Sequence, residues 1–285
     1  MADKKFRIEK DSMGELKVPA DKHWGAQTQR AVENFQISGY MMPEQYIRAL
    51  ALLKWSLASA NAEFDLISSE KADAIKDIAL KISEGEFSDQ FPVEVFQSGS
   101  ATSTNMNMNE VIANLGSSDN LKIHPNDDVN LGQSSNDVIP SSLSICVAIY
   151  LHEHMIPAAV HLEKTINDKA SKLTSVVKMG RTHLQDAMPI TMAQEMGGWS
   201  ASIRDSINQF ENALERIQEL AIGGTAVGTG VNTHPDVGPR ACELMNEKTG
   251  LNFKPSSDLF HAISSQDRSL LASSANRSLA VALTK

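Results

Sequence analysis

The chain of 285 residues is long enough for one large domain or two, and its 41% hydrophobic and 21% charged residues are typical of a globular protein. Its formal net charge of −9 argues against nucleic acid and anionic membranes as partners. The two cysteines, Cys146 and Cys242, lie in apolar stretches without metal-ligand spacing, so we expect buried thiols in a reducing compartment. The N-terminus has no apolar targeting segment, and no apolar run approaches the ~20 residues of a membrane span, so we expect a cytoplasmic protein.

After an extended start over residues 1–20, helical periodicity dominates the sequence, and the low aromatic content of 5% favours helix packing over sheet packing. Helices are predicted after Pro43, around residues 72–82 and over residues 104–115, with a connection at 85–97 and a polar loop at 116–130. A long helix is predicted to begin at Ser134 or Ser135 and to end near Leu173, with a kink at Pro157.

A second long helix has the clearest periodicity, with apolar residues at alternating spacings of four and three: Ile203, Ile207, Phe210, Leu214 and Ile217. The glycine-rich segment 223–230 is interpreted as a helix-breaking loop, with further helices from about Pro235 to Lys248 and from near Ser264. These patterns predict a mainly α protein, with an N-terminal mixed or helical domain over 1–130 and an elongated bundle of long helices over 131–285. Apolar seams of this length favour a homo-oligomer, and a monomeric bundle that buries every seam is the alternative.

Four polar clusters interrupt the helical pattern, at residues 98–110, 124–130, 133–137 and 180–189. The first and third place Ser, Thr and Asn at expected helix N-termini, where backbone N–H groups and hydroxyls can hold a carboxylate or phosphate; ordinary helix caps are the alternative. In the first cluster, the alternation of Asn105, Asn107 and Asn109 argues against a simple polar helix face, because Asn is a poor helix former unless its amide is used. The second cluster has turn residues, and its lack of a second His at ligand spacing argues against a metal site.

The fourth cluster is interpreted as a polar turn that joins two apolar helices. It contains His183, flanked by Arg181, Thr182, Gln185 and Asp186. A histidine with an unperturbed pKa of ~6.5 exchanges protons near neutrality, so His183 is the best candidate for proton chemistry, with a structural histidine as the alternative. Neither a serine-hydrolase elbow nor a P-loop motif occurs in the sequence.

In their order and spacing, the segments SGSATSTNMNMNEV, HPNDDVN, SSND, GRTHLQDAMP and GGTAVGTG resemble the aspartase/fumarase superfamily and, within it, the class II fumarases. His183 and Ser135 indicate the subfamily, because aspartate ammonia-lyases typically carry Gln and Thr at these places. The resemblance implies a fumarase-type helical bundle and a carbon–oxygen lyase, without cofactor or metal, that reversibly hydrates fumarate to (S)-malate in the tricarboxylic acid cycle. It also implies a small dicarboxylate ligand and a homotetramer whose active sites are each shared between three subunits.

The same resemblance implies a role for each matching residue. His183 is the catalytic histidine that handles the departing water, and His124, Asn126 and Asp127 match a secondary dicarboxylate site. The residues that match substrate-binding positions are Ser100, Thr102, Ser134, Ser135, Asn136 and Thr182.

One part of the family pattern does not occur in this chain. The family's mobile GSSxMPxKxN loop supplies a catalytic serine and a lysine, and the sequence reaches Lys285 without it, so we expect little or no activity from these 285 residues alone. Two alternatives to a fumarase stay open at this point. One is a lyase similar to aspartate ammonia-lyase, and the other is a non-catalytic helical assembly that has kept the scaffold.

Overall fold

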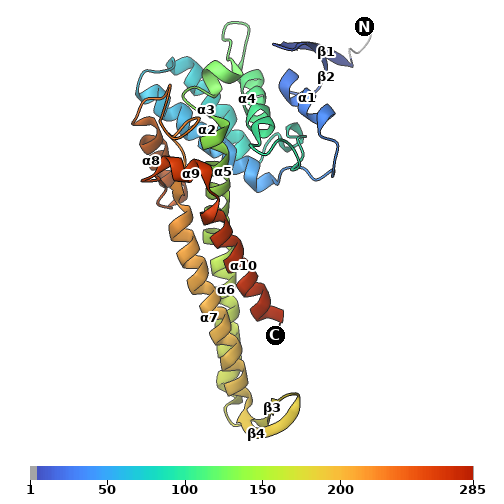
Figure 1. Cartoon of the computed structure of the whole chain (residues 1–285), viewed down its shortest axis with the longest axis vertical. Helices are drawn as coiled ribbons and strands as arrows, with labels where there is room; N and C mark the ends of the chain where they lie inside the picture. Colours follow the sequence, from blue (N-terminus) through green and yellow to red (C-terminus); the bar gives the residue numbers. More distant parts are fainter. Residues whose placement is uncertain (1–4, 285) are drawn as a thin grey trace. The chain divides into compact units, whose positions relative to one another are not determined.

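The computed structural model describes residues 5–284 and shows a mainly α protein with several long helices (Figure 1). The elements form two compact units. The first comprises Met1–Cys146 and Gln218–Gln266, and the second comprises Val147–Ile217 and Asp267–Lys285. The expected mainly α class is confirmed. The two units alternate along the chain and do not follow the expected division into 1–130 and 131–285, which stays a prediction about the family's domains.

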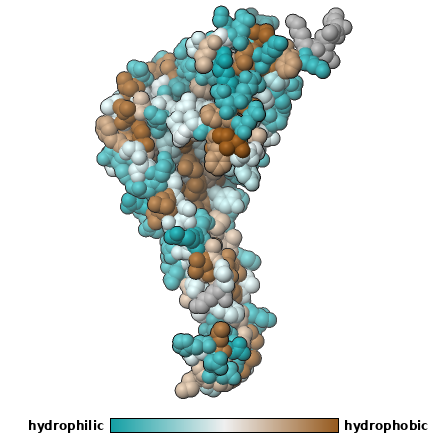
Figure 2. Space-filling view, turned by 45° about the vertical axis from the view of Figure 1, so that its right-hand side comes forward, coloured by the Kyte–Doolittle hydropathy of each residue, from teal (hydrophilic) through white to brown (hydrophobic). Residues whose placement is uncertain are grey.

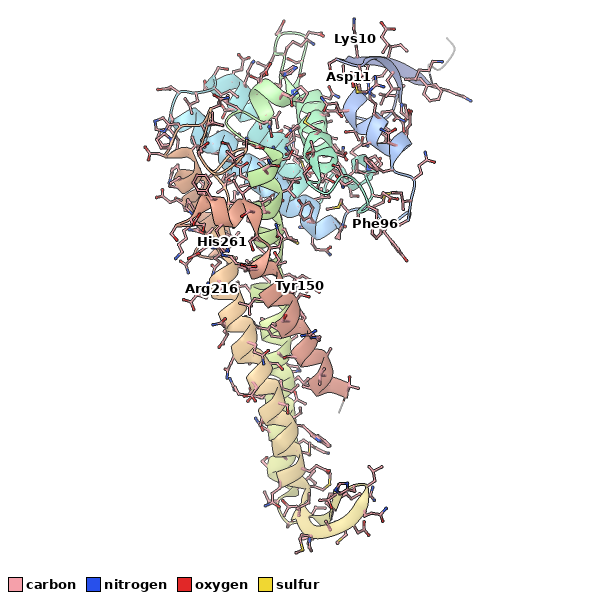
Figure 3. All side chains as sticks on the ribbon, viewed as in Figure 1. Lys10, Asp11, Phe96, Tyr150, Arg216 and His261 are labelled. Atoms are coloured by element: carbon pink, nitrogen blue, oxygen red, sulfur yellow. The ribbon has the colours of Figure 1, made fainter. Side chains whose placement is uncertain are left out.

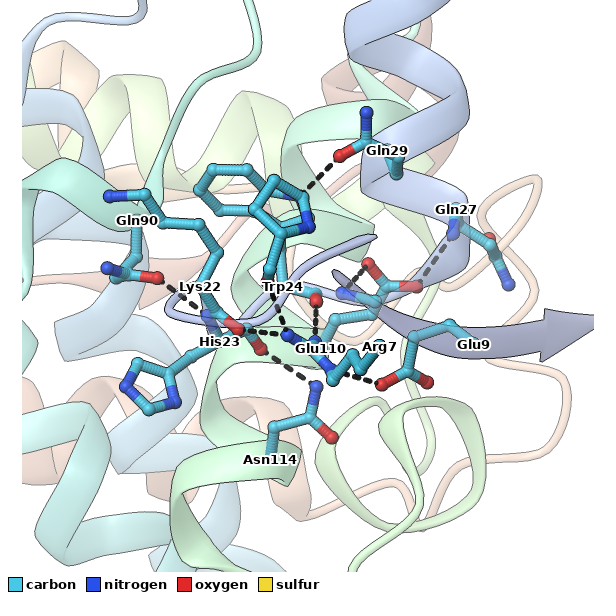
Figure 4. A network of polar contacts seen from close by, with 12 residues as sticks. Arg7, Glu9, Lys22, His23, Trp24, Gln27, Gln29, Gln90, Glu110 and Asn114 are labelled. Carbon is cyan, nitrogen blue, oxygen red and sulfur yellow. Dashed lines mark hydrogen bonds and ion pairs between the residues drawn. The ribbon is translucent and has the colours of Figure 1, made fainter. Parts of the chain in front are cut away.

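An antiparallel hairpin of β1 (Phe6–Asp11) and β2 (Gly14–Pro19) confirms the extended start from Phe6 onward, and residues 1–4 of that prediction lie outside the described residues. Arg7 in β1 donates hydrogen bonds to the backbone carbonyls of Lys22 and Trp24, in the segment that leads into the next helix (Figure 4). Asp11 at the end of β1 forms an ion pair of 2.9 Å with Arg30 in that helix, α1 (Ala26–Asn34). The hairpin is therefore attached to α1 by polar contacts.

The N-terminus of α1 rests on a carboxylate from another helix. Glu110 of α4 (Thr102–Gly116) is 5% exposed and accepts the backbone N–H groups of Gly25, Gln27 and Thr28 at 2.9–3.0 Å (Figure 4). It also accepts the Thr28 hydroxyl at 2.6 Å. The first N–H groups of a helix have no partner within the helix, so Glu110 caps α1 and fixes it to α4.

The core of the first unit is built on α2 (Glu44–Glu63), which packs against α3 (Ser69–Glu84), α4 and α8 (Val237–Thr249). Leu50, Leu53 and Leu57 on α2 are at most 1% exposed. The predicted helices after Pro43, around 72–82 and over 104–115 are thereby confirmed. The remaining elements of the unit are short: a 3-10 turn at Ser88–Gln90, a π-helical turn at Pro125–Val129, the strands β5 (Glu219–Leu220) and β6 (Lys254–Pro255), and α9 (Leu259–Ser264).

The predicted long helix runs without interruption from Ser135 to Leu173. It consists of α5 (Ser135–Tyr150), a π-helical turn at Leu151–Met155, α6 (Ile156–Ala170) and a 3-10 turn at Ser171–Leu173. The wider turn lies directly before Pro157, because the proline ring has no N–H to donate and crowds the preceding turn. The structure thus shows a π-helical turn beside this proline, and the kink expected at Pro157 stays a prediction.

In the second unit, α7 (Met192–Ile217) packs against α6 and α10 (Asp267–Thr284). Four residues of the predicted apolar seam of α7, Ile203, Ile207, Phe210 and Ile217, are at most 3% exposed, and the fifth, Leu214, is half-buried. The core where the three helices meet consists of Ala159, Ile203 and Ile207, with Leu162, Ile166, Leu279 and Ala282 packed around it.

Two further expectations concern the long helix and the cysteines. The helix Ser135–Leu173 is long enough to cross a membrane and has a mean hydropathy of 1.4 in its most apolar window, so the expectation that no stretch approaches span length is wrong. A core helix of a soluble protein has the same composition, so this observation alone is weak evidence for a membrane span. Cys146 and Cys242 are free thiols, and the expected burial is confirmed for Cys242, whereas Cys146 is half-buried.

Apolar side chains also remain on the surface, interspersed with polar ones (Figure 2). In Figure 3, Tyr150 and Phe96 project from the ribbon, and their exposed fractions are 45% and 58%. In the second unit, Trp199, Leu270 and Val281 are exposed by 42%, 66% and 67%. The helices of this unit therefore carry apolar residues that no other part of residues 5–284 covers.

Candidate functional site

The N-terminus of α4 presents two hydroxyls to solvent. Ser100 Oγ and Thr102 Oγ1 lie 2.9 Å apart, and both residues are exposed. Ala101 between them has a φ of 48°, in the left-handed region that residues other than glycine rarely adopt. Gln97 holds the turn by accepting the N–H of Thr104 at 2.9 Å and donating to its hydroxyl at 2.6 Å. The hydroxyls of Ser100 and Thr102 can therefore face a ligand at the helix N-terminus.

The three asparagines that follow are buried, with exposed fractions of 0–1%, and each uses its amide. Asn107 Nδ2 donates to a backbone carbonyl and Asn109 Nδ2 lies 3.6 Å from a methionine sulfur, so both have structural roles. Asn105 Nδ2 instead donates to Asn130 Oδ1 at 3.2 Å and to Ser135 Oγ at 3.1 Å. The prediction that these amides are used is confirmed, and Asn105 connects the first cluster to the third.

The third cluster forms the N-terminus of α5, as predicted. The Ser134 hydroxyl accepts the N–H of Asn136 at 3.2 Å, and the Ser134 N–H donates to Asp137 Oδ1 at 2.9 Å. This reciprocal arrangement is a helix cap with Asp in place of the usual Glu. Ser134 and Ser135 are half-buried and Asn136 is exposed, so their polar groups lie where the helix dipole favours an anion.

The glycine-rich loop at 223–230 is attached to this helix N-terminus. Asp137 Oδ2 accepts the N–H groups of Thr225 at 2.9 Å and Gly223 at 3.3 Å, and Asn136 Nδ2 donates to the Ala226 carbonyl at 2.8 Å. Asp137 is fully buried, and burial raises its pKa to about 6, against the opposing effect of the backbone N–H donors. The interpretation of the segment as a loop is confirmed, and the loop also supports the cluster at 133–137.

The second and third clusters share a cavity of about 490 Å³. Asn126 and Asp127 line it from the second cluster, Ser134 lines it from the third, and Thr225 and Ala226 line it from the glycine-rich loop. Its walls offer amide, hydroxyl and carboxylate groups, which suit a small polar ligand.

His124 caps the π-helical turn beside this cavity and accepts the N–H of Asp127 on its Nδ1 at 3.1 Å. In the same turn, Asp128 forms an ion pair of 2.8 Å with Lys71. Across residues 5–284, no three His, Cys, Asp or Glu side chains are grouped so that they could hold a metal ion.

The fourth cluster differs from the prediction. It is not a turn between helices but a β-hairpin, in which β3 (Val177–Thr182) pairs with β4 (Gln185–Thr191). His183 and Leu184 form the two-residue tip, and their φ values of 51° and 62° are those of a type I′ turn. Neither residue is a glycine, the residue that most often marks such a turn, so the sequence carries no signal for a hairpin here. A register shift between Met179 and Arg181 places Gly180 at a bulge, where a Cβ atom would lie 2.8 Å from the Met188 carbonyl.

The hairpin presents its candidate residues to solvent. Thr182 and His183 are both exposed, and Arg181 lies 3.7 Å from Asp186 across the hairpin. These residues belong to the second unit, and the clusters around Ser100, Asp127 and Ser134 belong to the first. The hairpin therefore gives His183 a defined backbone and a solvent-accessible imidazole.

One buried residue of the site carries no local sequence signal. Lys54 lies within α2, is 1% exposed, and donates to Asn130 Oδ1 at 2.9 Å and Gln133 Oε1 at 2.7 Å. Burial lowers its pKa to about 7, and the charge of Asp137 opposes this effect. In the sequence it is a single lysine in an apolar helix, which is typical of a surface position.

Comparison with known proteins assigns the chain to a family. The family model described as "Lyase" matches residues 14–285. The chain belongs to the lyase family. Among curated relatives, this lyase chain is 49% identical over 280 residues to "Fumarate hydratase class II 2" of Pseudomonas aeruginosa and 44% identical over 286 residues to "Fumarate hydratase class II" of Bacillus subtilis. These matches cover 98% of the chain and 61% and 62% of the relatives, so the chain spans about three fifths of their length.

Solved structures agree with this assignment. The chain matches a class II fumarase from Schistosoma mansoni with a TM-score of 0.95 at 34% identity, covering 98% of this chain and 63% of that one. It matches a fumarate lyase:delta crystallin from Brucella melitensis bound to cobalt with a TM-score of 0.91 at 36% identity, covering 98% and 62%. The fold of this lyase chain is therefore that of the fumarase and delta-crystallin proteins.

Proposed function

We propose that the protein containing this chain reversibly adds water to fumarate to give (S)-malate, as a carbon–oxygen lyase. The observation that carries the proposal is the pair of helix N-termini, α4 with the exposed hydroxyls of Ser100 and Thr102 and α5 with the half-buried Ser135, whose hydroxyl accepts a hydrogen bond from Asn105 of α4. Two helix N-termini with Ser and Thr hydroxyls suit a ligand with two carboxylates. The identities of 44–49% with class II fumarate hydratases over 98% of the chain support the same substrate.

In this proposal, the first unit binds the dicarboxylate through Ser100, Thr102, Ser134, Ser135 and Asn136. The C3 proton of malate is not acidic, so its removal requires donors that stabilise the negative charge that develops on the adjacent carboxylate. Hydroxyl groups and backbone N–H groups at a helix N-terminus are such donors. They need no reorganisation during the reaction, because the cap and the buried Asp137 already hold them in place.

His183 and Thr182 have the second role in this proposal. The C2 hydroxyl of malate is a poor leaving group, so it needs a proton as it departs, and a histidine can supply that proton near neutral pH. The exposed hairpin tip leaves the imidazole accessible, and Thr182 beside it can bind a substrate oxygen. Asn126 and Asp127, which line the cavity of about 490 Å³, are proposed with His124, which caps the same turn, as a second site for a dicarboxylate.

The test is turnover by the whole protein that contains this chain. Loss of fumarate is followed by its ultraviolet absorbance, and His183→Asn should lower kcat by about 10²–10⁴-fold. The matched control is His161→Asn, because His161 is an exposed histidine on α6. Wild-type kcat in His183→Asn, or equal losses in both variants, would contradict the assignment of His183.

The alternative chemistry is ammonia release from aspartate, as in aspartate ammonia-lyases. His183 and Ser135 stand where those enzymes typically carry Gln and Thr, which favours water over ammonia as the leaving group. Wild-type protein that releases ammonia from aspartate and leaves fumarate unchanged would show that the proposed substrate is wrong. Activity with neither substrate would instead favour a non-catalytic helical assembly.

We propose in addition a homotetramer with active sites shared between subunits, a cytoplasmic location and a place in the tricarboxylic acid cycle. The exposed apolar side chains of α7 and α10, among them Trp199, Leu270 and Val281, support a further interface on this unit. Light scattering on the whole protein should give the mass of four chains. The mass of a single chain would contradict the shared site.

A further inference from the structure

The buried cation behind the α5 N-terminus has an unusual set of partners. Lys54 is 1% exposed, and its two hydrogen-bond acceptors are the amide oxygens of Asn130 and Gln133. Lysines are rarely buried to this extent, because removing the ammonium from water is costly. Apolar residues fill most of α2, so a methionine or leucine would pack there without this cost.

A lysine side chain that holds its protons can donate hydrogen bonds but cannot accept them. Its position therefore fixes which end of each neighbouring amide faces it. Asn130 and Gln133 both turn their oxygens toward Lys54, and their nitrogens donate to backbone carbonyls: Asn130 Nδ2 to Gln133 at 3.3 Å, and Gln133 Nε2 to Val129 at 3.0 Å. Burial lowers the pKa of Lys54 to about 7, so the ammonium form, which has donors only, is the form below that pH, and the neutral amine above it keeps two N–H groups for these two acceptors.

The orientation of Asn130 then determines that of Asn105. Because Asn130 Oδ1 already faces this network, Asn105 presents its Nδ2 to it at 3.2 Å, and the same Nδ2 donates to Ser135 Oγ at 3.1 Å. The Oδ1 atom of Asn105 is buried without a hydrogen-bond partner.

The end of this series of hydrogen bonds is the Ser135 hydroxyl. Its oxygen accepts from Asn105, so its proton is directed elsewhere and can be donated to an anion at the α5 N-terminus. We propose that Lys54 is a positioning residue that, through Asn130 and Asn105, makes the Ser135 hydroxyl a donor to the bound carboxylate. This inference rests on the proposed function, because it assigns Ser135 to the dicarboxylate site.

The test is a double-mutant cycle between Lys54→Met and Ser135→Ala in the whole protein, with kcat and KM for fumarate measured. Ser135→Ala in the wild-type background should raise KM by about 10-fold or more, the effect of one hydrogen bond to a charged group. In the Lys54→Met background the same substitution should change KM by less than about 3-fold, because the hydroxyl is no longer directed at the ligand. Equal effects in the two backgrounds would overturn the proposal, since a merely structural role of Lys54 gives additive losses.

Asn105→Asp provides the same test with an almost unchanged side-chain shape. The carboxylate replaces the Nδ2 donor by an acceptor, so the Ser135 proton turns toward residue 105 and KM should rise by about 10-fold. Lys81→Met is the control, since Lys81 pairs with Asp77 on the exposed face of α3, and its KM should equal that of wild type. An unchanged KM in Asn105→Asp would overturn the proposal even if Lys54→Met does not fold.

A second measurement separates this proposal from the proposed function. The Asn105 side-chain amide protons should exchange slowly with solvent in the wild-type protein and faster in Lys54→Met, as measured by NMR. If wild-type protein does not hydrate fumarate, the proposed function fails, and faster exchange in Lys54→Met still supports the orientation of Asn105 by Lys54. Unchanged exchange contradicts that orientation whatever the substrate is.

Discussion

The buried carboxylate of Glu110 allows a quantitative prediction. It accepts four hydrogen bonds from the start of α1: three from the backbone N–H groups of Gly25, Gln27 and Thr28, and one from the Thr28 hydroxyl. Gly25 and Thr28 are buried, so water cannot replace the lost acceptor at these two residues. Glu110→Ala should therefore detach α1 from α4.

The size of the effect follows from these contacts. Each buried N–H group left without an acceptor costs about 1–3 kcal/mol, so Glu110→Ala should lower the free energy of unfolding by about 3–5 kcal/mol. Glu110→Gln keeps the shape of the side chain but replaces one oxygen by an N–H₂ group that faces donors, and should cost about 1–3 kcal/mol. Gly25→Ala tests the same contact from the other side, because its Cβ would lie 2.8 Å from Glu110 Oε1.

Urea unfolding followed by circular dichroism measures these losses, with Glu86→Gln as a control at an exposed position of the same unit. Amide hydrogen exchange at Gly25 and Thr28 adds a local measurement, since detachment of α1 should accelerate it without global unfolding. If Glu110→Ala lowers the free energy of unfolding by less than about 1 kcal/mol and leaves this exchange unchanged, the cap is not what holds α1.

Three further predictions concern single groups. Between pH 7 and 10, the unfolding free energy of wild type should rise relative to that of Lys54→Met by about 1.4 kcal/mol per pH unit. The reason is that the stability that Lys54 contributes is complete above its unfolded pKa of 10.5 and is lost as the pH falls to its folded pKa of about 7. A difference between the two proteins that does not vary with pH would contradict this burial. Leu184→Gly should raise the free energy of unfolding by about 0.5–1 kcal/mol, because glycine adopts the φ of 62° without strain. Thermal unfolding measures this change, and a lower midpoint temperature in the variant would show that the hairpin tip is not strained. Burial raises the pKa of the Cys146 and Cys242 thiols to about 11 and about 12, so iodoacetamide at pH 8 should label them only after unfolding, and fast labelling of native protein would refute this.

Regular helices of this chain could be predicted from local patterns. The alternating spacing from Ile203 to Ile217 predicts α7 because a seam of this kind has one stable arrangement, with its apolar residues against neighbouring helices. The start of α5 at Ser135 could be predicted because Ser134 and Asp137 form a local cap. In both cases the signal and the structure lie within the same few turns of chain.

The hairpin at 177–191 and the buried Lys54 could not be predicted in this way. The hairpin tip lacks the Asn-Gly or Asp-Gly pair that marks a type I′ turn, and His183 and Leu184 adopt left-handed backbone conformations against their preference. Lys54 is a surface residue by composition, and its burial depends on Asn130 and Gln133, which lie 76 and 79 residues away. Contacts between distant parts of the chain decide both features.

The attachment of the glycine-rich loop to α5 has a consequence for the order in which the molecule forms during synthesis. Asp137 Oδ1 accepts the N–H of Ser134 within the local cap, but Asp137 Oδ2 accepts the N–H groups of Gly223 and Thr225, 86 and 88 residues later in the chain. At about 5–20 residues per second, a ribosome needs roughly 4–18 s to synthesise that interval, in which the whole stretch Val147–Ile217 of the second unit is made. Until then, of these three N–H donors only Ser134 is available to Asp137, so the loop that supports the candidate dicarboxylate site joins the start of α5 seconds after that helix is made.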